Sequence, residues 1–357
     1  MSAAAGRWGR SLGWVLRAYP KGTRRDELLG TLREAGTRPG PRIFLNLVRH
    51  GLRARLGRPG SRVVVVVAVL VALTTGLGFA AVASRIAWSG VRDYPSGDRL
   101  AGITGTLFPG VAIEGGRSAT GLFFDYSEHS TLLHGHNEDF EFATYDFAPS
   151  GQNVAAPYRT WTDAAAARLT ADGWDVRDVW PTGATVIATG KLDEDGRAFW
   201  ATRDGLSLEF SASTNVVGTP PGSFYAEAHL GRLAPRWVTV VGGAGWLVGV
   251  LFGWFLTGYV SRRTEWASDA ARLASHAAAG IGLVLLLPAT LMGTLGLIAE
   301  PLRADRIYQP FWWLSVTWGY GCTVFGVLLG LIAIGAATVA GTRENRARAA
   351  EEPRAGA

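Results

Sequence analysis

The chain has 357 residues, of which 48% are hydrophobic and 18% charged, and its formal net charge is +6 at pH 7. Its single cysteine, Cys322, excludes an intrachain disulfide, so any part in water must fold on its own hydrophobic core. This length allows roughly two or three folded units.

The first 62 residues form a strongly basic segment. They carry 14 Lys and Arg against three Asp and Glu, a net charge of +11. Apolar residues at helical spacing predict one short helix over 7–19, a second over 23–35 and a third over 41–56. Pro20 ends the first, because the residue before a proline avoids helical geometry. We therefore expect residues 1–62 to form a helical prefix.

Three stretches of this prefix carry a family resemblance: Leu-Arg-Ala-Tyr-Pro (16–20), Arg-Arg-Asp-Glu-Leu-Leu-Gly-Thr-Leu (24–32) and Leu-Arg-Ala-Arg-Leu (52–56). In this layout the segment resembles the cytoplasmic prefix of actinobacterial multi-pass membrane proteins of unknown role. It is also similar to the helical prefixes of some bacterial permeases and to helical modules that partner small winged-helix repressors. The resemblance covers about the first 58 residues, implies little about activity, and leaves open a protein partner in the cytoplasm.

An uncharged stretch, Val63–Ala83, follows the prefix and lies between Arg62 and Arg85. As a helix it would be roughly 31 Å long, the thickness of a bilayer core. Ala81-Val82-Ala83 has the small-x-small form of a signal-peptide cleavage site, but the apolar run is too long for a signal peptide. We expect an uncleaved signal-anchor helix over 63–84.

Three more apolar runs, 237–260, 273–299 and 311–341, are each long enough to cross a membrane. The basic flank of the first run orients the N-terminus to the cytoplasm. Four spans then place residues 89–235 outside and the tail, 342–357, inside, where we expect disorder. The sequence thus predicts a multi-pass protein of the cell (inner or plasma) membrane with both termini cytoplasmic.

Small residues recur at every fourth position of three of these runs. In membranes such stripes allow helix backbones to approach closely, so they predict helix packing. The predicted packing residues are Ala68, Ala72, Gly76, Ala80, Gly245, Gly249, Gly253, Gly326 and Gly330.

Residues 89–235 carry 10 basic and 19 acidic side chains, and their pattern predicts an α+β domain. A helix is expected to end at Ala171, with strands over 119–126, 140–147, 174–180, 184–192, 197–203 and 206–214. Asp193-Glu194-Asp195-Gly196 is interpreted as a turn. Asp204-Gly205 predicts a two-residue hairpin, because both positions need a positive φ.

One cluster in this domain could bind a divalent metal through His134, His136, His129 and Asp125. The alternative is a polar loop joining two strands. We find no catalytic, nucleotide-binding or dinucleotide-binding motif, so we predict no enzyme activity and no cofactor. The predicted spans hold no Asp, Glu, Lys or Arg, which argues against a proton-coupled transporter or an ion channel.

The fold class that the sequence predicts is a bundle of four transmembrane helices with a cytoplasmic helical prefix and an extracytoplasmic α+β domain. The favoured function is a non-enzymatic sensor or accessory subunit that links the outer domain to the prefix. Two alternatives stay open: a permease-type subunit of an ATP-binding-cassette exporter, and an outer-surface metal-binding protein or metalloenzyme. The expected partner is the lipid bilayer, with anionic lipid at the basic prefix. Nucleic acid is not an expected partner.

Overall fold

A computed structural model describes residues 19, 26–28, 30–31, 40–57, 61–117, 144–150, 153–186, 191–214, 219–265, 267–299, 311 and 320–351. The chain divides into two compact units. The helical unit comprises residues 1–80, 244–291 and 321–357, and the sheet unit comprises 81–243 and 292–320. The boundary falls inside three continuous helices, at residues 80/81, 243/244 and 291/292, and at the start of a fourth, at 320/321.

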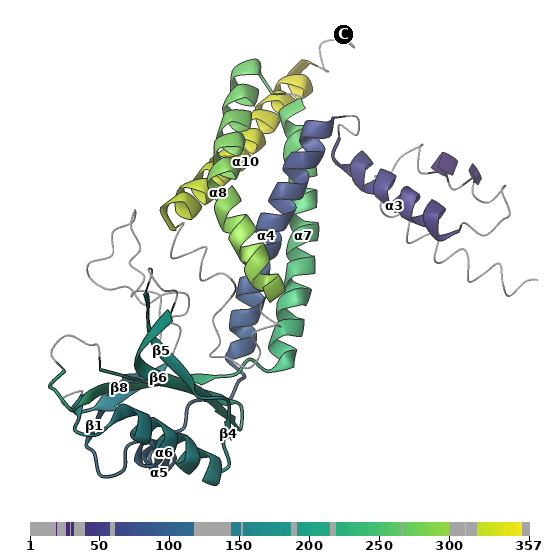
Figure 1. Ribbon diagram of the computed structural model, residues 1–357. Helices are drawn as coiled ribbons and strands as arrows, with labels where there is room; N and C mark the ends of the chain where they lie inside the picture. Colours follow the sequence, from purple (N-terminus) through teal and green to yellow (C-terminus); the bar gives the residue numbers. More distant parts are fainter. Residues whose placement is uncertain are drawn as a thin grey trace, which may run out of the picture. The chain divides into compact units, whose positions relative to one another are not determined.

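Four helices in Figure 1 are long and apolar enough to cross a membrane: α4 (Arg62–Trp88), α7 (Arg236–Glu265), α8 (Asp269–Ala299) and α10 (Tyr320–Glu351). A shorter helix, α3 (Pro41–Arg55), precedes them. The predicted disordered tail is wrong over residues 342–351, where α10 continues to Glu351. Ala, Arg and Glu dominate this stretch, and all three are strong helix formers.

Helices α4 and α7 approach each other through small residues. A Cβ added at Gly249 would lie 2.5 Å from the Thr75 carbonyl oxygen, and one added at Gly253 would collide with the Thr75 hydroxyl. The same hydroxyl donates to the Gly249 carbonyl at 2.8 Å. The α4 side of the contact contains buried Ala68 and Ala72. A larger side chain at either glycine would therefore force the backbones apart.

Helices α8 and α10 meet in the same way. A Cβ at Gly326 would lie 2.6 Å from Leu286 Cγ, and one at Gly282 would lie 2.9 Å from the Gly326 carbonyl oxygen. Gly330 differs from its predicted role, because a Cβ there would meet nothing within 4 Å. The amide nitrogen of Gly330 would lie 3.4 Å from a Cβ added at Gly282, so Gly330 contributes only its backbone to this contact.

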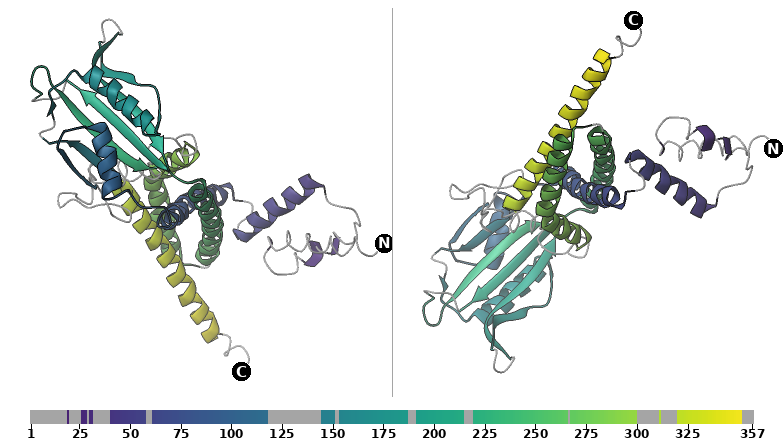
Figure 2. Two further views of the ribbon diagram at one scale, coloured as in Figure 1. Left: turned by 90° about the horizontal axis from the view of Figure 1, so that it is seen from below. Right: turned by 90° about the horizontal axis from the view of Figure 1, so that it is seen from above.

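The sheet unit contains, among its described residues, an eight-stranded antiparallel sheet with the path β1-β2-β8-β7-β6-β4, while β3 pairs with β8 and β5 with β6. Two helices, α5 (Asp98–Leu107) and α6 (Tyr158–Ala171), cover one face of it, as the two opposite views of Figure 2 show. The strands are β1 (Ile113–Arg117), β2 (Tyr145–Pro149), β3 (Asn153–Val154), β4 (Asp175–Val176), β5 (Trp180–Val186), β6 (Lys191–Arg203), β7 (Leu206–Ser213) and β8 (Phe224–Arg232).

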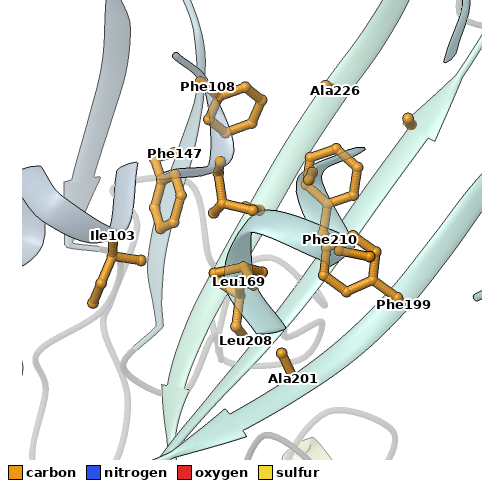
Figure 3. Close-up of a cluster of buried hydrophobic side chains, with 14 of the residues drawn as sticks. Ile103, Phe108, Phe147, Leu169, Phe199, Ala201, Leu208, Phe210 and Ala226 are labelled. Atoms are coloured by element: carbon orange, nitrogen blue, oxygen red, sulfur yellow. The ribbon is translucent and has the colours of Figure 1, made fainter. Parts of the chain in front are cut away.

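Large side chains fill the space between the helices and the sheet (Figure 3). The Phe199 and Phe210 rings stack with centroids 5.0 Å apart, and Phe108 contacts Phe210 at 5.8 Å. Arg168 of α6 joins the two helices by donating to the Thr106 and Leu107 carbonyls at 2.7 and 3.0 Å. The partial burial of this guanidinium lowers its pKa. The unit is a two-layer α+β fold with one aromatic core.

The strand predictions have mixed outcomes. The Asp204-Gly205 hairpin is confirmed, with φ of 50° and 80°, and it joins β6 to β7. The turn predicted at residues 193–196 is wrong, since β6 runs through it and pairs with β5 across an irregularity at Thr182/Gly183. The strand predicted at 119–126 lies outside the described residues. Helix α5 and strand β8 were not predicted.

Candidate functional site

The face of the sheet opposite the two helices carries polar side chains. Alternation along β8 sends Phe224, Ala226, Ala228 and Leu230 into the core, so the residues between them point to the other face. Strand β7 alternates in the same way. The residues of interest on this open face, which we call the polar strip, are Asp146, Trp200, Glu209, Ser211, Tyr225, Glu227 and His229.

Four residues of the polar strip stand in register across four neighbouring strands. Asp146 of β2 pairs with His229 of β8, His229 pairs with Glu209 of β7, and Glu209 pairs with Trp200 of β6. Directly opposite residues on one face have Cβ atoms about 4.5–5.5 Å apart. Strand pairing therefore brings together groups that are far apart in the sequence. The Trp180 ring packs edge-on against Trp200 at 5.0 Å and completes one end of the row.

His229 lies at the centre of a hydrogen-bonded network. Its Nδ1 lies 2.7 Å from Asp146 Oδ1, and its Nε2 lies 3.6 Å from Glu227 Oε1. Glu227 accepts further hydrogen bonds from the Tyr225 hydroxyl at 2.9 Å and the Ser211 hydroxyl at 3.2 Å. The side chains of His229, Asp146 and Glu227 are each about a third exposed. The network therefore faces the surface but is partly shielded from water.

The two carboxylates fix the charge of this histidine. Hydrogen bonding to Asp146 and then to Glu227 outweighs burial and raises the pKa of His229 to about 10. Hydrogen bonding to His229 in turn lowers the pKa of Glu227. Burial, aided by Glu227, raises the pKa of Tyr225 to about 12. Near neutral pH the network therefore holds an imidazolium between carboxylates and a neutral phenol.

This charge state defines what the polar strip can do chemically. An imidazolium has no lone pair for accepting a proton, so in this charge state His229 is a hydrogen-bond donor and not a general base. The strip combines the carboxylates of Asp146, Glu209 and Glu227 with one cation, so its balance is acidic. Carboxylates, hydroxyls and an indole ring on one surface suit a cationic or polyhydroxylated ligand.

The polar strip was missed by the sequence analysis, although a signal existed. The run Tyr225-Ala226-Glu227-Ala228-His229 alternates polar and small apolar residues with a period of two, the pattern of a half-buried strand. The predicted metal ligands His134, His136, His129 and Asp125 all lie outside the described residues, so that site stays a prediction. Within the residues that the structure describes, no group of three or more metal-ligating side chains converges.

A second feature, the Trp88 joint, connects the sheet to the ends of two helices inside the sheet unit. It consists of Trp88 at the end of α4, Val238 in the first turn of α7, and Arg232 at the end of β8. Trp88 and Val238 are buried against each other. The Arg232 guanidinium lies over the Trp88 ring at 5.1 Å and over the Tyr94 ring at 4.8 Å. These cation–π contacts hold the end of β8 against the end of α4.

A third feature, the α3–α7 contact, lies in the helical unit. The Trp254 indole N–H donates to the Leu52 carbonyl at 3.1 Å, and the Arg55 guanidinium lies over the Phe255 ring at 5.2 Å. A Cβ at Gly258 would lie 2.5 Å from the Arg55 carbonyl oxygen. The C-terminal turn of α3 thus packs closely on the second half of α7.

Comparisons of the chain with protein-family models, with curated proteins and with solved structures found no match. The geometry of the polar strip, the Trp88 joint and the α3–α7 contact is therefore the basis for any functional assignment.

Proposed function

We propose that the protein is a non-enzymatic membrane sensor or accessory subunit in which α7 transmits the state of the sheet unit to the N-terminal prefix. One observation carries this proposal. Helix α7 is a single helix from Arg236 to Glu265, its first turn belongs to the Trp88 joint, and its second half makes the α3–α7 contact.

The link from the sheet to α7 is short. Strand β8 ends at Arg232, and α7 begins at Arg236. Because Arg232 and Val238 both pack on Trp88, a displacement of β8 would also displace the first turn of α7. Shifts of about 1–2 Å along a packed helix are a common way to transmit a change between sites.

The link from α7 to the prefix depends on close packing. Gly258 lies against the backbone of Arg55, and Gly57 lies against the Arg262 side chain, so a rotation of α7 would break both contacts. Arg55 also donates to the Tyr19 carbonyl at 3.5 Å, which ties this residue of the prefix to the same helix end. A movement of α7 would therefore alter the surface that the prefix offers to a partner protein.

The polar strip supplies the receptor surface in this proposal. It includes Glu227 and His229 of β8, the strand that leads into α7. A cationic or polyhydroxylated ligand that replaced His229 as a partner of Glu227 would act directly on that strand. We assign the sheet unit to the outer side of the cell membrane and both termini to the cytoplasm, in line with the segregation of charge along the chain.

The orientation can be tested by labelling with a membrane-impermeant thiol reagent. Single cysteines would be placed at Ser2, Ser150 and Ala357 in a Cys322→Ala background. We expect labelling in intact cells only at position 150. Labelling at position 2 or 357 would overturn the topology.

The coupling can be tested by hydrogen–deuterium exchange across residues 41–57 in the full chain. Val238→Ala loosens the Trp88 joint, whereas Val240→Ala, two residues along the same helix, changes a side chain that is 71% exposed. We expect faster exchange in residues 41–57 for Val238→Ala alone. Equal exchange in both variants would contradict transmission through α7.

A permease-type subunit is the second candidate, favoured by the element order: one membrane-length helix, a large inserted domain, then three more such helices. Against it, α7 ends at Glu265 and α8 begins at Asp269, which leaves no room between them for a coupling helix. Co-purification from native membranes with mass spectrometry separates the candidates. A cassette ATPase in the eluate would favour the permease.

A further inference from the structure

A cavity of about 230 Å³ lies in the sheet unit beside the Trp88 joint. The chain that follows α4, the Asp204-Gly205 hairpin and the segment between β8 and α7 line it. Sites that enclose a drug-sized ligand measure about 300–1,000 Å³, so this cavity suits a more compact group.

Three arginines line the cavity: Arg92, Arg99 and Arg232. Arg99 donates to Asp204 at 3.0 Å, and Arg232 uses one N–H for the Arg92 carbonyl at 3.4 Å. The Arg92 guanidinium makes no hydrogen bond or ion pair with the residues that the structure describes. Among the described residues that line the cavity, Asp93 and Asp204 are the only carboxylates, so this lining is net positive within a domain whose sequence is net acidic.

The guanidinium of Arg232 is held ready for an anion. The centroids of the Trp88 and Tyr94 rings lie 5.1 and 4.8 Å from the guanidinium carbon, so the two rings restrict the side chain of Arg232. Most of its N–H donors make no hydrogen bond to the described residues. A guanidinium with a fixed orientation loses little entropy when it binds a phosphate through two parallel hydrogen bonds. Arg92 can supply a second charge to the same group.

The cavity also lies where two membrane-length helices end. Helix α4 ends at Trp88, two residues before the lining begins at Gly90, and Trp237 in the first turn of α7 is a lining residue. A Cβ at Gly90 would lie 3.4 Å from the Trp237 ring, so the two helix ends meet here. Tryptophans at the ends of spans mark the level of lipid headgroups.

We propose that this cavity is a phosphate site that takes the phosphodiester of a membrane lipid at the surface where α4 and α7 end. The guanidiniums of Arg92 and Arg232 bind the phosphate oxygens, and the indole of Trp237 lies beside the glycerol backbone. A soluble phosphate would offer the same oxygens, so the experiment must distinguish the two sources.

The test follows the thermal unfolding midpoint of the full chain in an uncharged detergent. Three additives are compared: phosphatidylglycerol, diacylglycerol with the same acyl chains, and sodium phosphate at the same phosphate concentration. We expect only phosphatidylglycerol to raise the midpoint. An equal rise with diacylglycerol would show that acyl chains alone suffice, and an equal rise with sodium phosphate would assign the cavity to a soluble anion; either result overturns the proposal.

Two matched variants locate the effect. Arg92→Gln removes a charge from the cavity, and Arg159→Gln removes one from α6, where that arginine pairs with Glu194 at 2.9 Å. Loss of one charge-assisted contact should raise the half-saturating phosphatidylglycerol concentration about tenfold for Arg92→Gln. Arg159→Gln should behave as the parent. The midpoint without lipid reports whether each variant is folded, and an unchanged lipid dependence in folded Arg92→Gln would refute the site.

Discussion

The two units bury opposite kinds of side chain. The sheet unit encloses the largest apolar residues, and Phe199, Phe210 and Phe224 are fully buried. The helical unit buries alanines such as Ala68 of α4 and Ala337 of α10, while Val63 of α4 and Leu251 of α7 are more than half exposed.

This difference follows from the solvent that each unit is built for. In water, removing large apolar surfaces from the solvent stabilises the fold, so rings belong inside. In lipid, a leucine gains little by leaving the solvent, and helices associate through close backbone contact and hydrogen bonds. Large side chains therefore stabilise the sheet unit, and their absence stabilises the helical unit.

The largest change that tests this contrast between the two units is removal of the helical unit. A fragment of residues 89–235 keeps α5, α6 and all eight described strands, together with the whole aromatic core. We expect it to fold alone and to unfold in urea in one cooperative transition, unaffected by a chelator. A transition abolished by a chelator and by the double change His134→Ala with His136→Ala would establish the predicted metal site as structural.

Truncation of one core ring should cost the most among single changes. Phe210→Ala leaves a cavity beside Phe199 and Phe108, and we expect a loss of about 3–5 kcal/mol from the free energy of unfolding of the fragment. Phe252→Ala in the full chain is the matched control, because Phe252 also packs on a ring, Phe79, but is 49% exposed. A similar fall in thermal midpoint for both changes in the full chain would erase the contrast between the units.

Enlargement of a small residue should have the converse effect in the helical unit. Gly253→Leu would push against Thr75 and Ala72, with an expected loss of about 1–3 kcal/mol. At Gly335 an added Cβ meets nothing within 4 Å, so Gly335→Leu should be tolerated. By the same reasoning, Gly249→Leu should lower the thermal midpoint in detergent more than Leu251→Ala. An equal loss of stability in Gly253→Leu and Gly335→Leu would show that the glycines between α4 and α7 are not a packing surface.

The polar strip predicts a pH dependence of the stability of the sheet unit. The pKa of His229 is raised from 6.5 to about 10, so its stabilising contribution is complete below pH 6.5 and is lost as pH rises through about 10. Tyr225 contributes little to this slope, because its pKa is raised from 10 to about 12 and its own stabilising contribution is therefore lost only above about pH 10. Urea unfolding of the fragment between pH 6.5 and 10 should show falling stability, and His229→Gln should flatten the slope. A parent slope of zero would refute the imidazolium assignment.

The smallest expected effect is the loss of one hydrogen bond between helices. Thr75→Val removes the bond to the Gly249 carbonyl, and such bonds in membrane proteins contribute about 0.6 kcal/mol on average. Thr338→Val is the control, since that hydroxyl bonds to Gly335 of its own helix. A thermal midpoint that falls as far as for Gly253→Leu would mean that hydrogen bonding, rather than close approach, holds α4 and α7 together.

Local chemistry explains which parts of the fold were predictable. Contiguous residues encode the four long apolar helices and the Asp204-Gly205 hairpin, so the sequence was sufficient to predict them. Residues 193–196 have the composition of a turn, but pairing with β5 overrides that preference and keeps them in β6. The alternation over residues 225–229 indicates a strand, but the assembly of the polar strip could not be predicted, because Asp146, Glu209 and His229 become neighbours only through the register of three strands.

The distance along the chain between α4 and its packing partner has a consequence for synthesis. The ribosome first completes α4, then makes residues 89–235 with all the described strands, and only afterwards makes α7. At about 5–20 residues per second this interval lasts roughly 10–30 s, during which α4 has no helix to pack on. Helix α4 has the highest mean hydropathy of the four and α7 the lowest. The first helix can therefore stay in the bilayer unaided, whereas α7 emerges directly ahead of α8 and beside a helix already in place.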